Sequence, residues 1–467
     1  MRAPNLWAFA VAAFALSACA LQDPPAREDS LKEAVPNAAP PANWASPGAP
    51  GGVADNWLAT LNDPRLDALV KEALAYNSDL RIAAARVDVA AAQLAGVKSP
   101  IYPQVSLLAR GGGKMSGDSS GLEGVGLFAS WELDLWGRVR SAAKASEMQF
   151  VSTQLDTEYA RQSIAALVAK SWFLAIEAGQ QKALAQSSLT SAEKLASLSR
   201  DRLRVGNGDE YDVALIDASV QSLRDTARSL DFTYTSALRS LEVLVGRYPA
   251  ASVTIADALP AYPGDTPAGV PSELLERRPD VVAAERRVAA AFYRTQEAKA
   301  ARLPTIKLTG NYTSVNSELF VLQERNNPIA SVGASLTQPL FLGGLLQSQV
   351  DARTAEQRAA VADYGKVGMR AFNEVEGTLA AGASAADREK ILAQGVSDND
   401  RALKLANVRY RVGSLDLRGV EQQQITLYAA RASLLRVQSD RLVQLVNLHL
   451  ALGGSFEPRP QPSASAY

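Results

Sequence analysis

The sequence contains the same pattern twice, and this duplication limits the possible folds more than any other feature. DLRIAAARV at 79–87 corresponds to DVVAAERRV at 280–288, 201 residues later. RVG at 204–206 corresponds to RVG at 411–413, 207 residues later. Because the order is kept while the offset grows slowly, the pattern indicates an internal duplication. We therefore expect two halves with the same succession of elements.

Each half is predicted to begin with an amphipathic helix and to continue with two strands. The helices are expected at about residues 63–97 and 272–301, ending near Pro100 and Pro304. The strands are indicated by apolar residues that alternate with polar or small ones. These alternating sets are Val105, Leu107 and Ala109; Val125, Leu127, Ala129, Trp131 and Leu133; Ile306, Leu308, Gly310 and Tyr312; and Val332, Ala334 and Leu336.

A very long helix is predicted to follow the strands in each half. Segments 141–205 and 345–412 contain no proline, and a helix of about 60 residues spans about 90 Å. A second helix is expected to return from each RVG turn to Gly246 or Gly453. Helices this long cannot bury an apolar stripe in a globule, so we expect coiled-coil pairs. Residues with a/d spacing are Ile164, Leu167, Leu174 and Ala178 on one long helix, and Tyr428, Ala432, Leu435 and Leu442 on a returning helix.

The four predicted strands have a length that crosses an outer membrane, about 9 to 11 residues each. Four strands cannot close into a barrel, and an open sheet edge in lipid leaves backbone groups unpaired at several kcal/mol each. We therefore expect the barrel to be shared between subunits, with three copies of the chain supplying twelve strands. The helices alone would fit a generic helical bundle equally well, and the strands argue against it.

The N-terminus is predicted to be an export signal that ends in a lipid attachment site. Met1 and Arg2 precede an apolar stretch at 6–16 and small residues, an order typical of export signals. LSAC at 16–19 resembles a bacterial lipobox, and Cys19 is the only cysteine of the chain. We expect Cys19 to carry covalent lipid as the first residue of the mature protein, since two or more acyl chains anchor stably. The alternative is a chance cysteine in a discarded signal.

Composition argues against several other classes of protein. The 48 basic and 49 acidic residues give a net charge of −1, so no nucleic-acid partner is expected. The single histidine, His449, is expected to pack at a helix interface, and no metal or other cofactor is expected. Glu132 and Asp134 lie at a strand end, where a structural role is favoured over acid/base catalysis. GGGKMSG at 111–117 lacks the spacing of a phosphate-binding loop. An enzyme is therefore the least favoured hypothesis.

Four motifs in this order resemble the TolC-like outer-membrane efflux factors, and most closely their lipoprotein branch, which serves drug-efflux systems of the resistance-nodulation-division type. The motifs are ASWELDLWGRVRSA at 129–142, LLERRPDVVAAERRV at 274–288, QPLFLGG at 338–344 and YRVGSLDL at 410–417. The resemblance implies a mainly α fold with a membrane β-barrel portion. The protomer would be a tandem duplication of long coiled-coil helical hairpins plus four β-strands. A homotrimer would form a 12-stranded outer-membrane β-barrel and a periplasmic α-barrel tunnel.

The resemblance also implies partners and site residues. The helix turns would dock onto a periplasmic adaptor (membrane fusion) protein, which links the tunnel to an inner-membrane efflux pump. The docking residues would be Arg204, Val205, Gly206, Arg411, Val412 and Gly413. Both glycines also suit a helix C-cap, so a bare cap without docking is the alternative.

Relatives often carry aspartates at the narrow end of the tunnel, and this sequence departs from that pattern. It has Gly419 and Gln422 at two such positions. Asp209, Asp212 and Asp416 are the candidates to supply the ring of acids, which would attract cations. The alternative is that they are ordinary acids at helix N-termini, where they interact favourably with the helix dipole.

The resemblance predicts a passive exit duct for small molecules such as drugs and toxic compounds, in the outer membrane of a Gram-negative bacterium. Two alternatives remain: the exit channel of a protein-secretion system, and a lipid-anchored periplasmic coiled-coil scaffold. The expected segments are a signal peptide (1–18), a lipidated Pro/Ala-rich arm (19–56), a first repeat (57–250), a linker (251–271), a second repeat (272–454) and a flexible tail (455–467).

Overall fold

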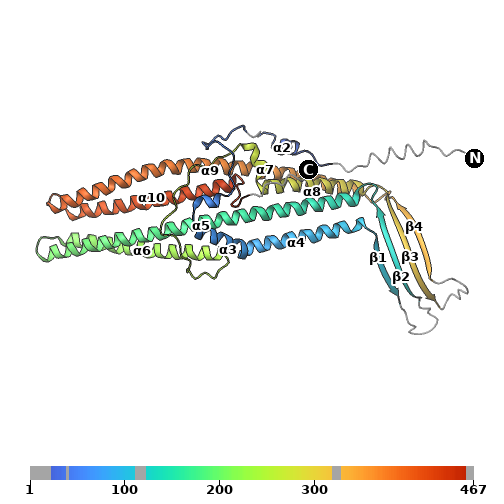
Figure 1. Cartoon of the computed structure of the whole chain (residues 1–467), viewed down its shortest axis with the longest axis horizontal. Coiled ribbons are helices and arrows are strands. Elements are labelled where there is room, and N and C mark those ends of the chain that lie inside the picture. Colours follow the sequence, from blue (N-terminus) through green and yellow to red (C-terminus); the bar gives the residue numbers. More distant parts are fainter. Residues whose placement is uncertain (1–22, 38–40, 111–121, 318–327, 459–467) are drawn as a thin grey trace, which may run out of the picture. The chain divides into compact units, whose positions relative to one another are not determined.

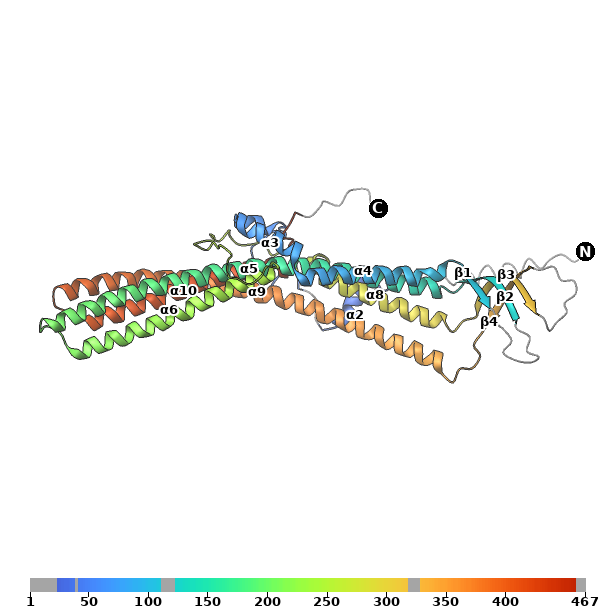
Figure 2. The same cartoon turned by 90° about the horizontal axis from the view of Figure 1, so that it is seen from below.

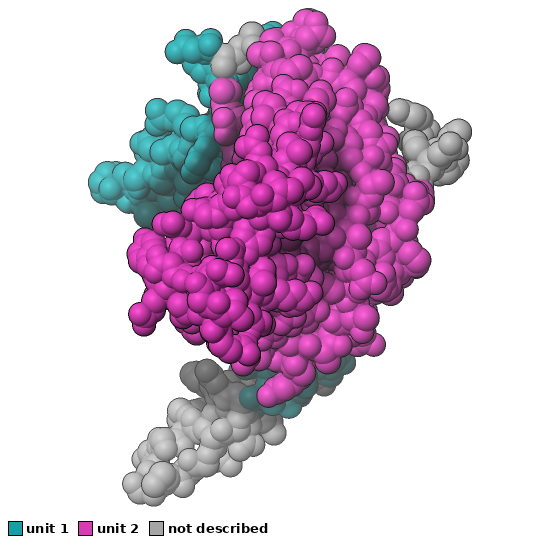
Figure 3. All heavy atoms as spheres, turned by 90° about the vertical axis from the view of Figure 1, so that its left-hand side faces the viewer, with its two compact units in different colours: residues 1–39, 85–156, 280–367 teal, residues 40–84, 157–279, 368–467 magenta. Residues whose placement is uncertain are grey.

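The computed structural model describes residues 23–37, 41–110, 122–317 and 328–458, which form two compact units. Unit 1 comprises residues 1–39, 85–156 and 280–367, and unit 2 comprises residues 40–84, 157–279 and 368–467 (Figure 3). Each unit therefore contains segments from both halves of the duplicated sequence. The signal, Cys19 and the glycine-rich segment 111–117 lie outside the described residues.

Unit 1 contains a four-stranded antiparallel sheet in the order β1-β2-β3-β4 (Figure 1). The strands are β1 (Gln104–Arg110), β2 (Leu122–Leu133), β3 (Thr305–Ser317) and β4 (Ile329–Thr337). The pairing of β2 with β3 joins the two halves of the sequence and places Leu127 opposite Tyr312. All residues of β4 are exposed, as are Val105 and Leu107 of β1. The prediction of four strands is confirmed.

Two carboxylates connect β2 to the start of helix α5 (Arg138–Arg204), and this junction lies in unit 1. Glu132 accepts two hydrogen bonds from the Arg138 guanidinium, at 2.9 and 2.8 Å. Asp134 accepts from the backbone N–H groups of Val139 and Arg140, at 3.0 and 2.9 Å, and so satisfies donors in the first turn of the helix. Both acids therefore stabilise the strand-to-helix junction, as the sequence indicated.

The predicted first helix of each half is broken into two. In the first half, α3 (Pro64–Tyr76) and α4 (Ser78–Lys98) are separated by Asn77. The Asn77 side chain accepts from the backbone N–H groups of Asp79 and Leu80, at 2.9 and 3.2 Å, and thereby caps α4.

In the second half, α7 (Pro271–Arg277) ends before α8 (Pro279–Ala300). Pro279 disfavours the helical conformation of the residue that precedes it. The prediction of one unbroken helix at 63–97 and another at 272–301 was therefore wrong.

The long helical hairpins are confirmed. α5 and α9 (Leu345–Arg411) each contain 67 residues, and the returning helices α6 (Glu210–Leu244) and α10 (Leu417–Ala451) each contain 35. Within unit 2, hairpin α5–α6 lies beside hairpin α9–α10 in both views, and α6 contacts α10 (Figures 1 and 2). Among the helices that the structure describes, none has the length and hydropathy needed to cross a membrane.

The buried stripe of α5 differs from the predicted a/d set. Ile164 and Ala178 are buried, but Leu167 and Leu174 are 39% and 46% exposed. The fully buried positions include Ala165, Val168, Ala169, Trp172, Phe173 and Ile176. Trp172 decides this rotation of the helix, because its ring packs in the core of unit 2 with Trp57 and its Nε1–H donates to Asp63 at 2.8 Å. The prediction was wrong for the two leucines because small and aromatic residues, rather than leucine, fill the interface.

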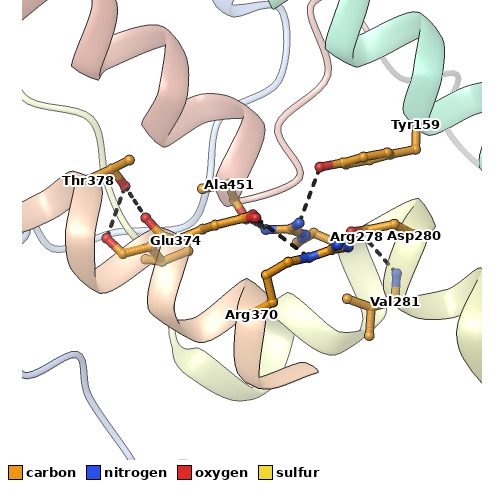
Figure 4. A network of polar contacts seen from close by, with 9 residues as sticks. Tyr159, Arg278, Asp280, Val281, Arg370, Glu374, Thr378 and Ala451 are labelled. Atoms are coloured by element: carbon orange, nitrogen blue, oxygen red, sulfur yellow. Dashed lines mark hydrogen bonds and ion pairs between the residues drawn. The ribbon is translucent and has the colours of Figure 1, made fainter. Parts of the chain in front are cut away.

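A fully buried arginine organises unit 2 at the end of α7 (Figure 4). The Arg278 guanidinium donates to the Glu374 carboxylate at 2.6 Å, to the Ala451 carbonyl at 3.1 Å and to the Tyr159 hydroxyl at 3.4 Å. Arg370, one turn before Glu374, forms a second ion pair with it at 3.7 Å. A buried charge is tolerated only when it is paired and hydrogen-bonded, and these contacts tie α7 to α5, α9 and α10.

Residues 41–56 of the Pro/Ala-rich arm belong to unit 2 and pack within it. The Trp44 indole donates to the Ala268 carbonyl at 3.0 Å, and the N–H groups of Ala45 and Ser46 donate to Glu376 of α9 at 2.7 and 2.8 Å. Further along, Ala49 forms a parallel bridge with Pro267. The arm is therefore fixed to the linker between the two repeats and to one long helix.

Candidate functional site

The two RVG turns have the same backbone geometry, at the same end of unit 2 (Figure 1). Gly206 and Gly413 have φ of 77° and 79°, the left-handed region that favours glycine. After α5, Gly206 N–H donates to the Leu203 carbonyl at 3.0 Å and Asn207 N–H to the Arg202 carbonyl at 2.9 Å. The turn after α9 repeats both bonds, at 3.1 and 2.9 Å. Each turn is therefore a Schellman C-cap, as the capping interpretation requires.

The surroundings of the two glycines are open. A Cβ added at Gly206 or Gly413 would meet no heavy atom within 4 Å, so backbone conformation alone favours glycine there. The preceding Val205 and Val412 are 70% and 74% exposed, and the Arg204 side chain is 75% exposed. Each turn thus presents one apolar and one cationic side chain outward. Figure 3 shows unit 2 from the end that carries the turns.

Two of the three candidate acids are helix caps. Asp209 begins α6 and accepts from Tyr211 N–H at 3.1 Å. Asp416 begins α10 and accepts from Gly419 N–H at 3.0 Å. Such contacts satisfy free N–H groups in the first turn and are favoured by the helix dipole. Asp209 and Asp416 therefore act as helix caps, as the alternative interpretation of these acids expects.

Asp212 links the two hairpins. Its carboxylate lies 3.2 Å from Arg418 Nε of α10, which also lies 3.3 Å from Asp416. The Arg418 guanidinium stands 5.6 Å from the centre of the Tyr211 ring. The pairing with Asp212 is an ion pair without hydrogen-bond geometry.

A second cross-link joins the hairpins close by. The Arg202 guanidinium donates to the Tyr410 hydroxyl at 2.8 Å and stands 5.4 Å from the centre of that ring. Arg202, Tyr410 and Arg418 were not predicted as site residues. No spacing rule connects positions that belong to different copies of the repeat, and an arginine beside a helix end is ordinary on its own.

A cleft of about 630 Å³ opens between the two turns. Its walls include Asp209, Asp212 and Asp416 together with Arg202 and Tyr410. The structure therefore brings the three predicted acids to one place. Gly413 lines this cleft as well, whereas Val205, Gly206 and Val412 are not part of its walls.

His449 packs in the core of unit 2, as predicted. Its ring stacks on Trp57 with centroids 5.8 Å apart, and Nε2 lies 3.2 Å from the Thr266 hydroxyl. Burial lowers the pKa of His449 to about 4. Within the described part of the chain, no group of three His, Cys, Asp or Glu residues could hold a metal ion.

Comparison with known proteins identifies the class. The chain matches the family model of outer membrane efflux proteins over residues 69–247 and 270–454, and it belongs to this family of transport proteins. The pyoverdine export outer membrane protein OpmQ of Pseudomonas putida is 31% identical over 443 residues, with 90% of this chain and 93% of that protein covered. The antibiotic efflux pump outer membrane protein ArpC of Pseudomonas putida is 29% identical over 469 residues, with 97% and 96% covered.

A solved structure shows the same architecture. The outer-membrane channel OprN superposes with a TM-score of 0.81 at 26% identity, over 91% of this chain and 99% of that chain. The predicted family, the helical-hairpin fold with four strands, the efflux role and the outer-membrane location are thereby confirmed. The match stops at residue 247 and resumes at residue 270, which leaves out most of the linker expected between the repeats.

Proposed function

We propose that the chain acts as a homotrimer, a passive duct whose twelve strands close a barrel in the outer membrane. The observation that supports it is the sheet itself: β1 and β4 are edge strands within the described residues, and β4 is exposed along its whole length. Open edges in lipid are not tolerated, so neighbouring copies must pair with them. Unheated protein should migrate on a detergent gel as a trimer and boiled protein as a monomer. Protein that remains strictly monomeric in a bilayer would contradict the proposal.

The cargo we propose is small molecules. Relatives of similar length are named for the export of pyoverdine and for antibiotic efflux. A passive duct needs a partner for energy, so deletion of the gene should raise cell sensitivity to toxic compounds only when a cognate pump is present. Equal sensitivity with and without that pump would contradict the coupling.

The turns are proposed to dock on a periplasmic adaptor that leads to an inner-membrane pump. Support comes from Val205 and Val412, which are 70% and 74% exposed at the two turns. We expect Val205→Glu with Val412→Glu to abolish pump-dependent resistance while the trimer still assembles. Because neither position needs a positive φ, the turns should persist.

A matched control tests the position of the charge. Val243 and Ile391 are 59% and 70% exposed on α6 and α9, away from the turns. Val243→Glu with Ile391→Glu adds the same charge and should leave resistance unchanged. Equal effects of the two pairs, at equal trimer levels, would argue against docking at the turns. Bulky substitutions of Gly206 and Gly413 should give the same loss, with added backbone strain.

We propose Asp209, Asp212 and Asp416 as the acids of the tunnel aperture. Because Asp416 also caps α10, Asp416→Asn keeps an acceptor for Gly419 N–H and removes only the charge. In planar bilayers this variant should show weaker cation selectivity, and Asp416→Ala should add a loss of helix stability. Unchanged selectivity in Asp416→Asn would remove this residue from the aperture.

The lipid on Cys19 completes the proposal. A lipobox cysteine with two or more acyl chains would hold the arm at the outer membrane. Mass spectrometry of the mature protein should find the N-terminal residue acylated, and Cys19→Ser should accumulate with its signal uncleaved. An unmodified thiol at position 19 in the mature protein would refute this part.

A further inference from the structure

A second cavity lies inside unit 2, between the hairpins α5–α6 and α9–α10. Its volume is about 100 Å³, and all four helices contribute to its walls. On α5 the wall contains three small polar residues, Ser187, Ser188 and Ser191, beside Leu184 and Ala192. A helix interface is normally filled by larger apolar side chains. The cavity is therefore a gap in the packing that the serines leave open.

Glu421 of α10 lines this cavity and has no partner there. The residue is only 7% exposed, and among the residues that the structure describes none donates a hydrogen bond to its carboxylate or forms an ion pair with it. Arg431 lines the same cavity, but it pairs with Asp400 of α9 at 3.1 Å. The described chain thus supplies no cation to Glu421.

Tyr428 adds a hydroxyl group and an aromatic surface to the cavity. It lies two turns after Glu421 on the same face of α10, and its hydroxyl has no hydrogen-bond partner among the described residues. Burial raises the pKa of Tyr428, so the hydroxyl stays protonated and neutral. The cavity therefore offers one anionic group, several hydroxyls and one aromatic ring.

A buried carboxylate is costly unless a cation or hydrogen-bond donors compensate it. A divalent metal ion would need several oxygen ligands, and the described residues contain no group of acids that could hold one. An ammonium group needs fewer contacts, since one carboxylate and nearby hydroxyls can accept its hydrogens. The donor set therefore favours an organic cation over a metal.

We propose that this cavity binds a small protonated amine. Its ammonium group pairs with Glu421, and its apolar body packs on the Tyr428 ring and on Leu184 and Ile425. A cavity of about 150 Å³ holds benzene, so the occupant of this cavity of about 100 Å³ is smaller than benzene. The site goes beyond the channel role and needs neither a docked adaptor nor a pump, so its test stands apart from the proposed function.

Isopropylamine is a suitable probe, with isopropanol as its neutral analogue of matched size. Full-length protein in lipid nanodiscs is titrated with each compound, and binding is followed by saturation-transfer difference NMR. We expect the amine to bind saturably and the alcohol to bind at least about tenfold more weakly, because charge-assisted hydrogen bonds are the stronger ones. Equal binding of the two compounds, or no saturable binding of the amine, would overturn the proposal.

Two variants and one control locate the site. Glu421→Gln keeps the shape and removes the charge, and we expect amine affinity to fall by about tenfold or more. Ser188→Leu fills the cavity without touching Glu421 and should also abolish binding. Glu193→Gln removes an exposed acid of α5 that pairs with Arg224 at 2.7 Å, and it should bind the amine as the parent does. Unchanged affinity in either Glu421→Gln or Ser188→Leu would refute the assignment.

Discussion

Glu242 holds the chain where it leaves the first repeat. It is fully buried near the end of α6. One carboxylate oxygen accepts from Ala251 N–H at 2.6 Å, and the other accepts from the N–H groups of Ser252 and Val253 at 2.6 and 3.2 Å. The Ser252 hydroxyl adds a fourth bond at 2.9 Å. Ala251 has a φ of 58°, which is unfavourable for alanine, so the clamp holds a turn that the backbone alone would not favour.

The cost of Glu242→Ala follows from these bonds. Three backbone donors lose their acceptor, and a buried unsatisfied donor costs about 1–3 kcal/mol. Ser252 is exposed and Ala251 is half-buried, so water can reach two of the three donors, while Val253 is buried. We therefore expect a local destabilisation of about 2–4 kcal/mol. This corresponds to about 30-fold to 1000-fold more frequent opening of the turn.

Hydrogen exchange measured by mass spectrometry reads this opening directly. Peptides that cover residues 250–254 should exchange faster by about two orders of magnitude in Glu242→Ala, while peptides from the middle of α6 stay protected. Glu242→Gln is the matched control. Its amide oxygen can still accept from the N–H groups of Ser252 and Val253, whereas the Ala251 N–H then meets the amide NH₂, which cannot accept a hydrogen bond. It should give an intermediate rate. Equal protection in all three proteins would refute the clamp.

The same residue gives a pH dependence with a fixed sign. Burial would raise the pKa of Glu242, but the hydrogen bonds from Ser252, Ala251 and Val253 outweigh burial and hold it below its ordinary value. A carboxyl group with a lowered folded-state pKa contributes its full stability above the unfolded-state pKa, about 4.3. The contribution is lost as pH falls through the folded-state pKa. Exchange at residues 250–254 should therefore accelerate in strong acid, and Glu242→Gln should remove this dependence.

Two further perturbations act on the core of unit 2. Burial lowers the pKa of His449 to about 4. The free energy of unfolding should therefore decrease as pH falls from about 6.5 to about 4, because only the unfolded state then takes up the proton. His449→Gln should flatten the dependence of the unfolding midpoint on pH over this window, and an unchanged slope would exclude His449 as the cause. Trp172→Phe should lower the free energy of unfolding by about 1–3 kcal/mol, because it opens space in the core and leaves Asp63 without its indole donor. A thermal unfolding midpoint equal to that of the parent would contradict this account.

The features that could be predicted from the sequence are periodic or local. Alternation of apolar residues gave the four strands, and the absence of proline over more than 60 residues gave the long helices, because both follow from side-chain direction and backbone sterics. Gly206 and Gly413 marked the turns because a Schellman cap needs a positive φ. The family resemblance rested on the order of these same elements.

Features that depend on packing between distant segments could not be predicted. Leu167 and Leu174 have coiled-coil spacing, but which face of α5 is buried is decided by Trp172 and its partners in other segments. The break at Asn77 had a local signal, since Asn-Ser-Asp is a common helix start, but an amphipathic pattern that continued on both sides obscured it. The contact of Arg418 with Asp212 joins the two copies of the repeat, so no local rule could have found it.

The space for an acidic side chain at position 419 is limited by the neighbouring Leu415. A Cβ at Gly419 would lie 2.7 Å from Leu415 Cδ1, closer than real contacts, so a side chain there requires Leu415 to move. Asp416, three residues earlier, has no such conflict and uses the Gly419 N–H as its capping donor. Because Leu415 is a flexible, half-buried side chain that can rotate away, Gly419→Asp alone should loosen the α9–α10 turn only modestly, measured as a small increase in hydrogen exchange at residues 412–419. Adding Leu415→Ala should restore protection, and a double variant that exchanges as fast as the single one would show that the conflict lies elsewhere.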